Sequence, residues 1–249
     1  MGRFPMGTEA ARMGPLLSRL ARAADEGGFD SLWTMDHFFQ IPITGQPPEA
    51  PLLEAYAVLA FLAAETERIR LGTMVTCVVY RHPGVLIKAV TSIDVLSGGR
   101  VIFGVGAGAP FNELPPGRSP PNTLQRPHPP ILIAGSGERK TLRLVARHGD
   151  MCNLFDLPGT GFADDLAHKL GVLRAHCQDA GRDYSAIEKT VSSFVDPDGD
   201  PARFLAHLAE LADLGISHAI VSPGRPWDEA TFDRVATIVP EVHAIPTAG

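Results

Sequence analysis

Cysteine is scarce in this 249-residue chain, which has Cys77, Cys152 and Cys177 alone. Three scattered thiols are too few for a disulfide framework or a cysteine zinc site, and they suit a reducing cytoplasm. Charged residues are also few, at 20%, and the formal net charge is −6. Because no basic cluster offsets this charge, the chain lacks the electrostatic footprint of nucleic-acid binding. We therefore expect no nucleic-acid partner and no metal site.

Long apolar runs are missing as well. No run reaches the roughly 18 residues that a membrane-spanning helix needs, and residues 1–5 contain no apolar signal core. We accordingly expect no membrane association, no export and a cytoplasmic location. The chain instead has 45% hydrophobic residues, enough to bury the core of one α/β barrel or of two small domains. We predict one domain over residues 1–249.

Helical and strand patterns alternate along this domain. Apolar residues at helical spacing predict helices over 15–26, 51–68, 83–96, 138–148, 163–180, 201–214 and 227–238. Runs rich in β-branched and aromatic residues predict strands over 29–35, 69–79, 101–106, 131–134, 151–155, 190–195 and 218–221. A helix after each strand implies parallel pairing with right-handed crossovers. The pattern therefore predicts a barrel or a doubly wound sheet, with seven strands.

The stretch 109–130 interrupts this alternation. It holds eight prolines in 22 residues and has no helical period. Proline removes backbone donors and is excluded from helix interiors. We predict an irregular proline-rich connection here, in place of a helix that would cover the neighbouring strands.

Two strand ends carry residue types that suit a binding or catalytic site. The run from Phe29 to Phe38 closes a buried strand with Asp36 and His37, a titratable pair at the rim where barrel enzymes place their chemistry. Gly135, Ser136 and Gly137 separate the strand 131–134 from the next helix, where small residues let a phosphate approach backbone N–H groups. On these residues alone, His37 can also be a plain rim residue, and the glycines a tight turn.

The segment Gly104–Gly108 resembles a dinucleotide loop only superficially. It follows a strand, but Ala109 and Pro110 replace the turn into a helix, and no acidic partner strand follows at the expected distance. A nicotinamide-binding Rossmann domain is therefore not expected.

Six blocks of the chain, taken in order, resemble the bacterial luciferase-like monooxygenase family. They are 29–38, Glu65–Thr73, Tyr80–Pro83, Asp94–Arg100, Gly104–Gly108 and Pro130–Gly137. Within this family the chain is most similar to the oxidoreductases that use the deazaflavin coenzyme F420. The resemblance implies a TIM (β/α)8-type barrel, usually dimeric, with a deazaflavin or flavin at the carboxyl ends of the strands. This barrel is shortened here, because the family's first strand is missing or reduced to residues 1–5, and its fourth helix with an insertion is missing after Glu113.

The resemblance also implies roles for individual residues. His37 corresponds to a histidine that faces the coenzyme ring, so it is expected to manage the proton while Asp36 orients it. Thr73, Met74 and Val75 match a bulge with a non-proline cis peptide behind the ring, although the sequence itself is equally compatible with a plain buried strand. Gly135, Ser136 and Gly137 match a phosphate-binding loop. Asn153, at the next strand end, is expected to add a side-chain contact.

One departure from the family pattern bears on the reaction. Sugar and alcohol dehydrogenases of the deazaflavin branch carry a catalytic glutamate at the position that matches Ala107. We therefore predict hydride transfer between F420 and a small organic substrate, as a reductase rather than an alcohol dehydrogenase, in a homodimer. Two alternatives remain open: an FMN-dependent monooxygenase, and a catalytically silent flavin-binding or interaction protein, which the missing elements favour.

Overall fold

The computed structural model describes residues 1–40, 46–106, 124–157 and 165–247. These residues form two compact units, which divide between Pro130 and Ile131. Each unit is a parallel sheet with helices packed on it. The organisation of residues 1–249 as a single domain stays a prediction.

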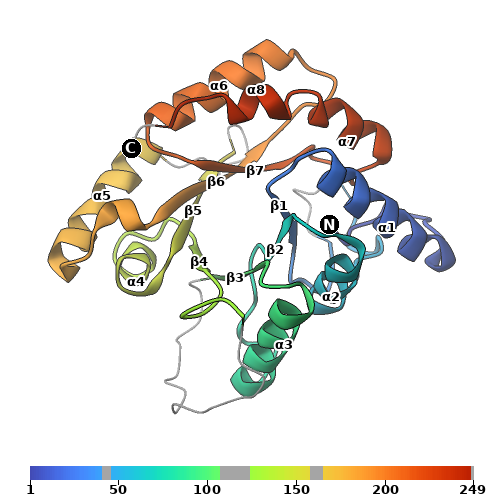
Figure 1. Cartoon of the computed structure of the whole chain (residues 1–249), viewed down its shortest axis with the longest axis horizontal. Helices are drawn as coiled ribbons and strands as arrows, with labels where there is room; N and C mark the ends of the chain where they lie inside the picture. The colour runs from blue at the N-terminus through green and yellow to red at the C-terminus, as the bar shows by residue number, and fades with distance from the viewer. Residues whose placement is uncertain (41–45, 107–123, 158–164, 248–249) are drawn as a thin grey trace. The chain divides into compact units, whose positions relative to one another are not determined.

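The first unit contains three parallel strands and three helices. The strands are β1 (Ser31–Thr34), β2 (Arg70–Thr73) and β3 (Val101–Gly106), and the helices are α1 (Ala10–Glu26), α2 (Ala55–Glu65) and α3 (Pro83–Leu96). Leu32 pairs with Leu71, and Leu71 pairs in turn with Val101 (Figure 1). Each strand follows a helix, and all three carboxyl ends lie at the same edge of the sheet. This edge is where Asp36, His37 and residues 73–75 lie.

Several boundaries in this unit differ from the sequence prediction: α2 and β1 are shorter at both ends than the predicted 51–68 and 29–35, and two other elements differ further. Helix α1 begins at Ala10 and holds Pro15 in its interior, so the predicted start at Pro15 was wrong. Strand β2 ends at Thr73, well before the predicted end at Val79, because the chain leaves the ladder there and rejoins β3 only by a bridge from Thr76 to Val105. Residues 83–96 and 101–106 form the predicted elements.

Residues 1–5 do not form a parallel strand. Arg3 makes an isolated antiparallel bridge with Leu52, the N–H of Phe4 donates to Pro51 O at 3.0 Å, and the N–H of Leu53 donates to Gly2 O at 3.0 Å. Phe4 is 1% exposed. These contacts anchor the segment in the unit. It does not form a strand of the parallel sheet, and the sequence analysis expected this first barrel strand to be missing or reduced.

Residues 124–130 return to the first unit after the proline-rich stretch. The buried carboxylate of Asp94 accepts hydrogen bonds from Leu124 N at 2.8 Å and Gln125 Nε2 at 2.7 Å, and Phe103 N donates to Pro130 O at 3.0 Å. No helix occurs in 124–130. The rest of the predicted irregular connection, up to residue 123, lies outside the described residues, as does the position of the missing fourth helix after Glu113.

The second unit contains four parallel strands. They are β4 (Ile131–Ala134), β5 (Met151–Asp156), β6 (Glu188–Phe194) and β7 (His218–Ser222), and its helices are α4 (Thr141–His148), α5 (Leu166–Ala180), the short η2 (Tyr184–Ala186), α6 (Pro201–Asp213), α7 (Glu229–Ala236) and α8 (Val239–His243). Leu132 pairs with Met151, Leu154 with Val191, and Val191 with Ala219. The last predicted helix, 227–238, corresponds to α7 alone, and α8, with Pro240 in its first turn, follows beyond the predicted end.

An apolar cluster joins the sheet and helices of this unit. Its fully or nearly fully buried members are Leu142, Leu154, Leu166, Leu170, Val191, Leu208, Leu211 and Ile216. Because Leu154 and Val191 point toward the helices, their neighbours in the alternating strand pattern, Asn153 and Thr190, point to the opposite face of the sheet. The core thus determines which polar side chains can face a ligand.

None of the helices that the structure describes has the length and apolar character to cross a membrane. Within these same residues, no group of three or more His, Cys, Asp or Glu side chains is arranged to hold a metal ion.

The buried carboxylate of Asp25 fastens the end of α1 to the start of β2. It accepts hydrogen bonds from the N–H groups of Glu67, Arg68 and Ile69 at 3.0, 3.1 and 2.8 Å. Burial raises the pKa of Asp25, but these bonds outweigh it and hold the pKa below its usual value. The stabilisation is therefore present above the unfolded-state pKa and is lost as pH falls through the lower, folded-state pKa.

We expect Asp25→Asn to lower the free energy of unfolding by about 2 kcal/mol at neutral pH, because an amide replaces one acceptor oxygen with a donor. Urea unfolding at about pH 7 and about pH 3 measures the change, and the gap from wild type should narrow at the lower pH. The control is Asp179→Asn, at an exposed position of α5. A gap of equal size at both pH values would contradict the role of the ionised carboxylate.

Candidate functional site

The rim of the first unit begins where β1 ends. Asp36 is 4% exposed, whereas His37 is exposed, and no hydrogen bond to its side chain occurs within the described part of the chain. Phe38 follows, 65% exposed, and stacks on Tyr80 with 4.2 Å between ring centroids. An accessible imidazole therefore lies between a buried acid and an exposed aromatic pair.

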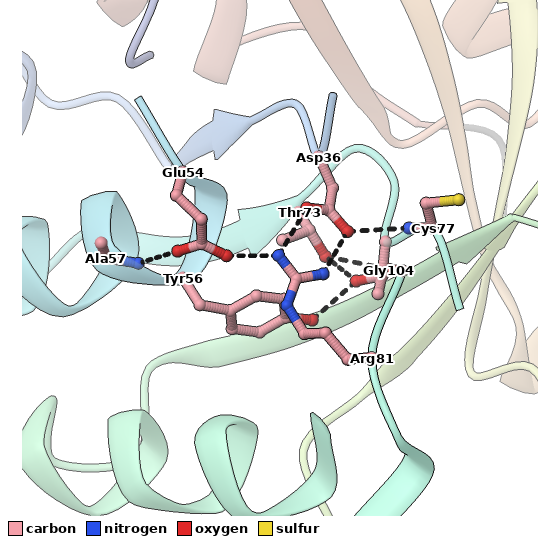
Figure 2. A network of polar contacts seen from close by, with 9 residues as sticks. Asp36, Glu54, Tyr56, Ala57, Thr73, Cys77, Arg81 and Gly104 are labelled. Carbon is pink, nitrogen blue, oxygen red and sulfur yellow. Dashed lines mark hydrogen bonds and ion pairs between the residues drawn. The ribbon is translucent and has the colours of Figure 1, made fainter. Parts of the chain in front are cut away.

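We had expected Asp36 to orient His37, but its carboxylate makes no hydrogen bond to the His37 ring. Its Oδ2 accepts from Arg81 Nη1 at 2.7 Å and from Cys77 N at 2.9 Å, and its Oδ1 accepts from Arg81 Nη2 at 2.8 Å (Figure 2). The guanidinium is the better partner for a buried carboxylate because it is always charged and binds both oxygens. Asp36 consequently fixes the backbone next to His37, not the imidazole itself.

Arg81 is the centre of this network. Besides Asp36 it pairs with Glu54, whose other oxygen caps α2 by accepting from Ala57 N at 2.7 Å. Its guanidinium carbon lies 4.8 Å from the centre of the Tyr56 ring. Hydrogen bonding to Asp36 raises the pKa of Arg81. The arginine thus joins three segments: the end of β1, the start of α2 and the chain after β2.

The segment from Thr73 to Cys77 follows β2 along this rim. The peptide between Met74 and Val75 is cis, which settles the isomer that the sequence left open. Met74 N donates to Thr34 O and Thr76 N donates to Gly104 O, both at 2.8 Å. The segment is therefore hydrogen-bonded to β1 on one side and to β3 on the other.

A chain of hydroxyl groups lies under the same segment. Thr73 Oγ1 donates to Gly104 O at 2.9 Å, and it lies 2.7 Å from Thr76 Oγ1, which lies 2.7 Å from Tyr56 Oη. Because the Thr73 hydroxyl donates its hydrogen to the Gly104 carbonyl, it must accept from Thr76. The Thr76 hydroxyl must in turn accept from Tyr56. Burial raises the pKa of Tyr56 to about 12, which keeps its proton in place for this donation.

Glycines in β3 let its backbone approach this segment closely. A Cβ atom on Gly104 would lie 1.8 Å from Thr73 O, and one on Gly106 would lie 3.1 Å from Val75 Cγ2. The glycines noted in the sequence thus serve strand packing behind residues 73–75. Ala107 and Gly108 lie outside the described residues.

The loop between β4 and α4 has the features of an anion cradle. Gly135 has φ +119°, a conformation that favours glycine, and a Cβ atom on Gly137 would lie 2.9 Å from Thr141 Oγ1. Gly135 N donates to Asn153 O at 3.1 Å, while the N–H groups of Ser136 and Gly137 have no acceptor among the described residues. A turn over residues 138–140 separates them from α4, which begins three residues later than predicted.

The Asn153 side chain has partners on a neighbouring strand, and its expected contact with a phosphate stays a prediction. Its side chain is fully buried, with Nδ2 donating to Thr190 Oγ1 at 2.8 Å and Oδ1 accepting from Ser192 at 2.9 Å. Both partners lie on β6 and face the same side of the sheet. The amide joins two strands, and only its backbone carbonyl contacts the glycine loop.

The sequence analysis missed Arg81, Glu54, Tyr56 and Thr76. Arg81 lies within the block Tyr80–Pro83, so the one signal available was an arginine beside a strand end with an acid at the end of a neighbouring strand. Its two carboxylate partners are separated from it by 45 and 27 positions. That pairing follows from strand order, not from local sequence.

Comparison with known proteins places this geometry in a family. Residues 8–126 match the model of the luciferase-like monooxygenase family. The F420-dependent glucose-6-phosphate dehydrogenase of Nakamurella multipartita is 37% identical over 50% of this chain and 36% of its own length. That of Kineococcus radiotolerans is 27% identical over 88% of this chain and 77% of its own length. The chain thus spans about a third of the first of these relatives and most of the second.

Among solved structures, the chain is similar to an F420-dependent secondary alcohol dehydrogenase in complex with an F420–acetone adduct. The TM-score is 0.70 at 18% identity, and the match covers 91% of this chain and 94% of that one. This likeness confirms the fold class, α/β of the incomplete (β/α)8 type, with seven strands in the described part. Residues 8–126, which carry the rim of His37 and Arg81, are the part of the chain that matches the luciferase-like monooxygenase family model.

Proposed function

We propose that this protein is an oxidoreductase that transfers a hydride between coenzyme F420 and a small organic substrate. The observation that carries the proposal is His37, an exposed imidazole at the carboxyl end of β1 whose neighbour Asp36 is held by a buried ion pair. The F420-dependent relatives support the choice of coenzyme.

The residues of the first unit fit a flat ring. Thr73, Met74 and Val75 form a segment bonded on both sides, with Gly104 and Gly106 packed behind it, and we assign these three residues to the face of the ring. When bound, the deazaflavin supplies or accepts the hydride. His37 supplies or accepts the accompanying proton at an imidazole nitrogen, as a positioned general acid or base does.

The glycine loop of the second unit fits a phosphate. Two N–H groups without an acceptor in the described part of the chain, from Ser136 and Gly137, precede a helix whose N-terminal dipole favours an anion. We assign Gly135, Ser136 and Gly137 to the phosphate of the coenzyme. The expected Asn153 contact stays a separate prediction.

The direction of the reaction is a finer proposal. Ala107 offers no carboxylate at the position where related dehydrogenases are expected to carry a glutamate, so the base expected to take the proton from an alcohol in those enzymes is missing here. We therefore propose a reductase, acting on an unsaturated or carbonyl-containing small molecule.

Titration of the purified chain with F420 and, separately, with FMN tests the proposal. We expect the fluorescence of F420 to change on binding and the change to saturate as the protein sites fill. We also expect an enone or a ketone to oxidise the bound, reduced coenzyme. Saturable binding of FMN alone, with oxygen consumption on reduction, would instead identify a monooxygenase. Binding of neither coenzyme would refute the oxidoreductase.

We also propose a homodimer, which the resemblance implied. Helix α3 supports it, because Val85 and Leu96 are 61% and 72% exposed on a helix that is apolar around most of its circumference. Sedimentation at micromolar concentration checks this, and a monomer at that concentration would contradict it.

A further inference from the structure

The ion pair between Arg81 and Asp36 is built as a fixed element. Arg81 Nη1 donates to Asp36 Oδ2 at 2.7 Å and Arg81 Nη2 donates to Asp36 Oδ1 at 2.8 Å, and the two side chains are 17% and 4% exposed. The Tyr56 ring covers one face of the guanidinium. A bidentate pair with these partners restrains orientation as well as distance.

Asp36 passes this restraint to two pieces of the rim. It directly precedes His37, and its Oδ2 also accepts from Cys77 N at 2.9 Å. Cys77 ends the segment that starts at Thr73, and Figure 2 shows the Asp36 carboxylate between Arg81 and the N–H of Cys77. One carboxylate therefore holds the backbone next to His37 and the far end of residues 73–77 together. The network therefore joins the two parts of the rim that the proposed function uses.

Asp36 depends on Arg81 for its charge balance. A buried carboxylate that loses its cation keeps the desolvation cost without the compensating attraction. Water or a shift of the chain must then solvate it, and either change moves Cys77 and His37. By contrast, Glu54 is 48% exposed, and its pairing with Arg81 is replaceable by water.

We propose that Arg81 is a positioning residue: through Asp36 it fixes both the start of His37 and the backbone from Thr73 to Cys77. The inference rests on the proposed function, since the positioned residues are those assigned to the coenzyme ring and the proton. In this proposal, Arg81 makes no contact with the coenzyme or the substrate. Its whole effect passes through the carboxylate.

A double-variant experiment tests this. Arg81→Met leaves the Asp36 charge buried and unpaired, and we expect it to raise the F420 dissociation constant by about 30-fold. Adding Asp36→Asn removes that charge while the amide oxygen still accepts from Cys77 N, so affinity should return to within about threefold of wild type. Arg81→Lys keeps the charge but loses the planar guanidinium, so its dissociation constant should lie between those of Arg81→Met and the double variant.

The matched control is Glu54→Gln, which removes the exposed partner of the same arginine and should change the dissociation constant by less than about threefold. Urea unfolding of each variant reports folding separately, and Arg81→Lys carries the test if Arg81→Met does not fold. Failure of Asp36→Asn to restore affinity in Arg81→Met would overturn the proposal, since Arg81 would then act by another route. Wild-type affinity in Arg81→Met would overturn it too. Absence of F420 binding by the wild type would instead refute the proposed function.

Discussion

Replacing His37 by alanine is expected to lower turnover by about 10²-fold or more while F420 affinity stays within about threefold of wild type. The imidazole is exposed and has no hydrogen-bond partner among the described residues, so its loss breaks no contact that holds the fold. Asp36, Arg81 and Cys77 keep their bonds to one another. The variant therefore separates proton transfer from coenzyme binding.

The measurement is single-turnover oxidation of the reduced, bound coenzyme, with affinity determined by fluorescence on the same samples. His148→Ala is the control, because it removes an equally exposed imidazole at the end of α4. Unchanged turnover in His37→Ala would make His37 a plain rim residue. A large loss of affinity with normal turnover would make it a coenzyme ligand and not the proton carrier.

Much of the fold follows from local sequence. The helix 83–96 and the strand 101–106 have the predicted bounds because Pro83 starts the helix and the Gly98–Gly99 pair ends the turn before the strand. Helix α1 begins five residues before Pro15, at Ala10, because the packing of Met13 and Leu17 outweighs the backbone hydrogen bond that Pro15 cannot donate. Packing of that kind is invisible in a residue pattern.

The site was only partly predictable, and the reason is the range of its contacts. Strand ends and glycine loops are local features, so His37 and Gly135–Gly137 could be selected as candidates from the sequence, whereas Thr73–Val75 were selected through the family resemblance. The partner of a side chain is not local: Asp36 binds Arg81, and Asn153 binds Thr190 and Ser192, because neighbouring parallel strands bring their ends together. Acids and amides at strand ends therefore need the strand register before a role can be given to them.

The glycine loop offers the second large effect: Gly137→Asp is expected to raise the F420 dissociation constant by about 10²-fold. The new carboxylate would repel a phosphate beside the N–H groups of Ser136 and Gly137, and its Cβ would lie 2.9 Å from Thr141 Oγ1, at the start of α4. Thr141 is 8% exposed and has little room to move. Charge and crowding therefore act in the same direction.

Gly137→Ala separates the two causes, since it adds the Cβ without the charge, and we expect it to weaken binding by only about threefold to tenfold. Gly171→Asp provides the matched control: it introduces the same carboxylate on α5, where a Cβ meets nothing within 4 Å. Fluorescence titration of all three variants, with the dissociation constant measured at low and high salt, gives the comparison. Because salt screens repulsion but not crowding, the deficit of Gly137→Asp relative to Gly137→Ala should shrink at high salt. If Gly137→Asp bound F420 as tightly as Gly171→Asp, the loop would be a tight turn of the fold and the phosphate would have to bind elsewhere.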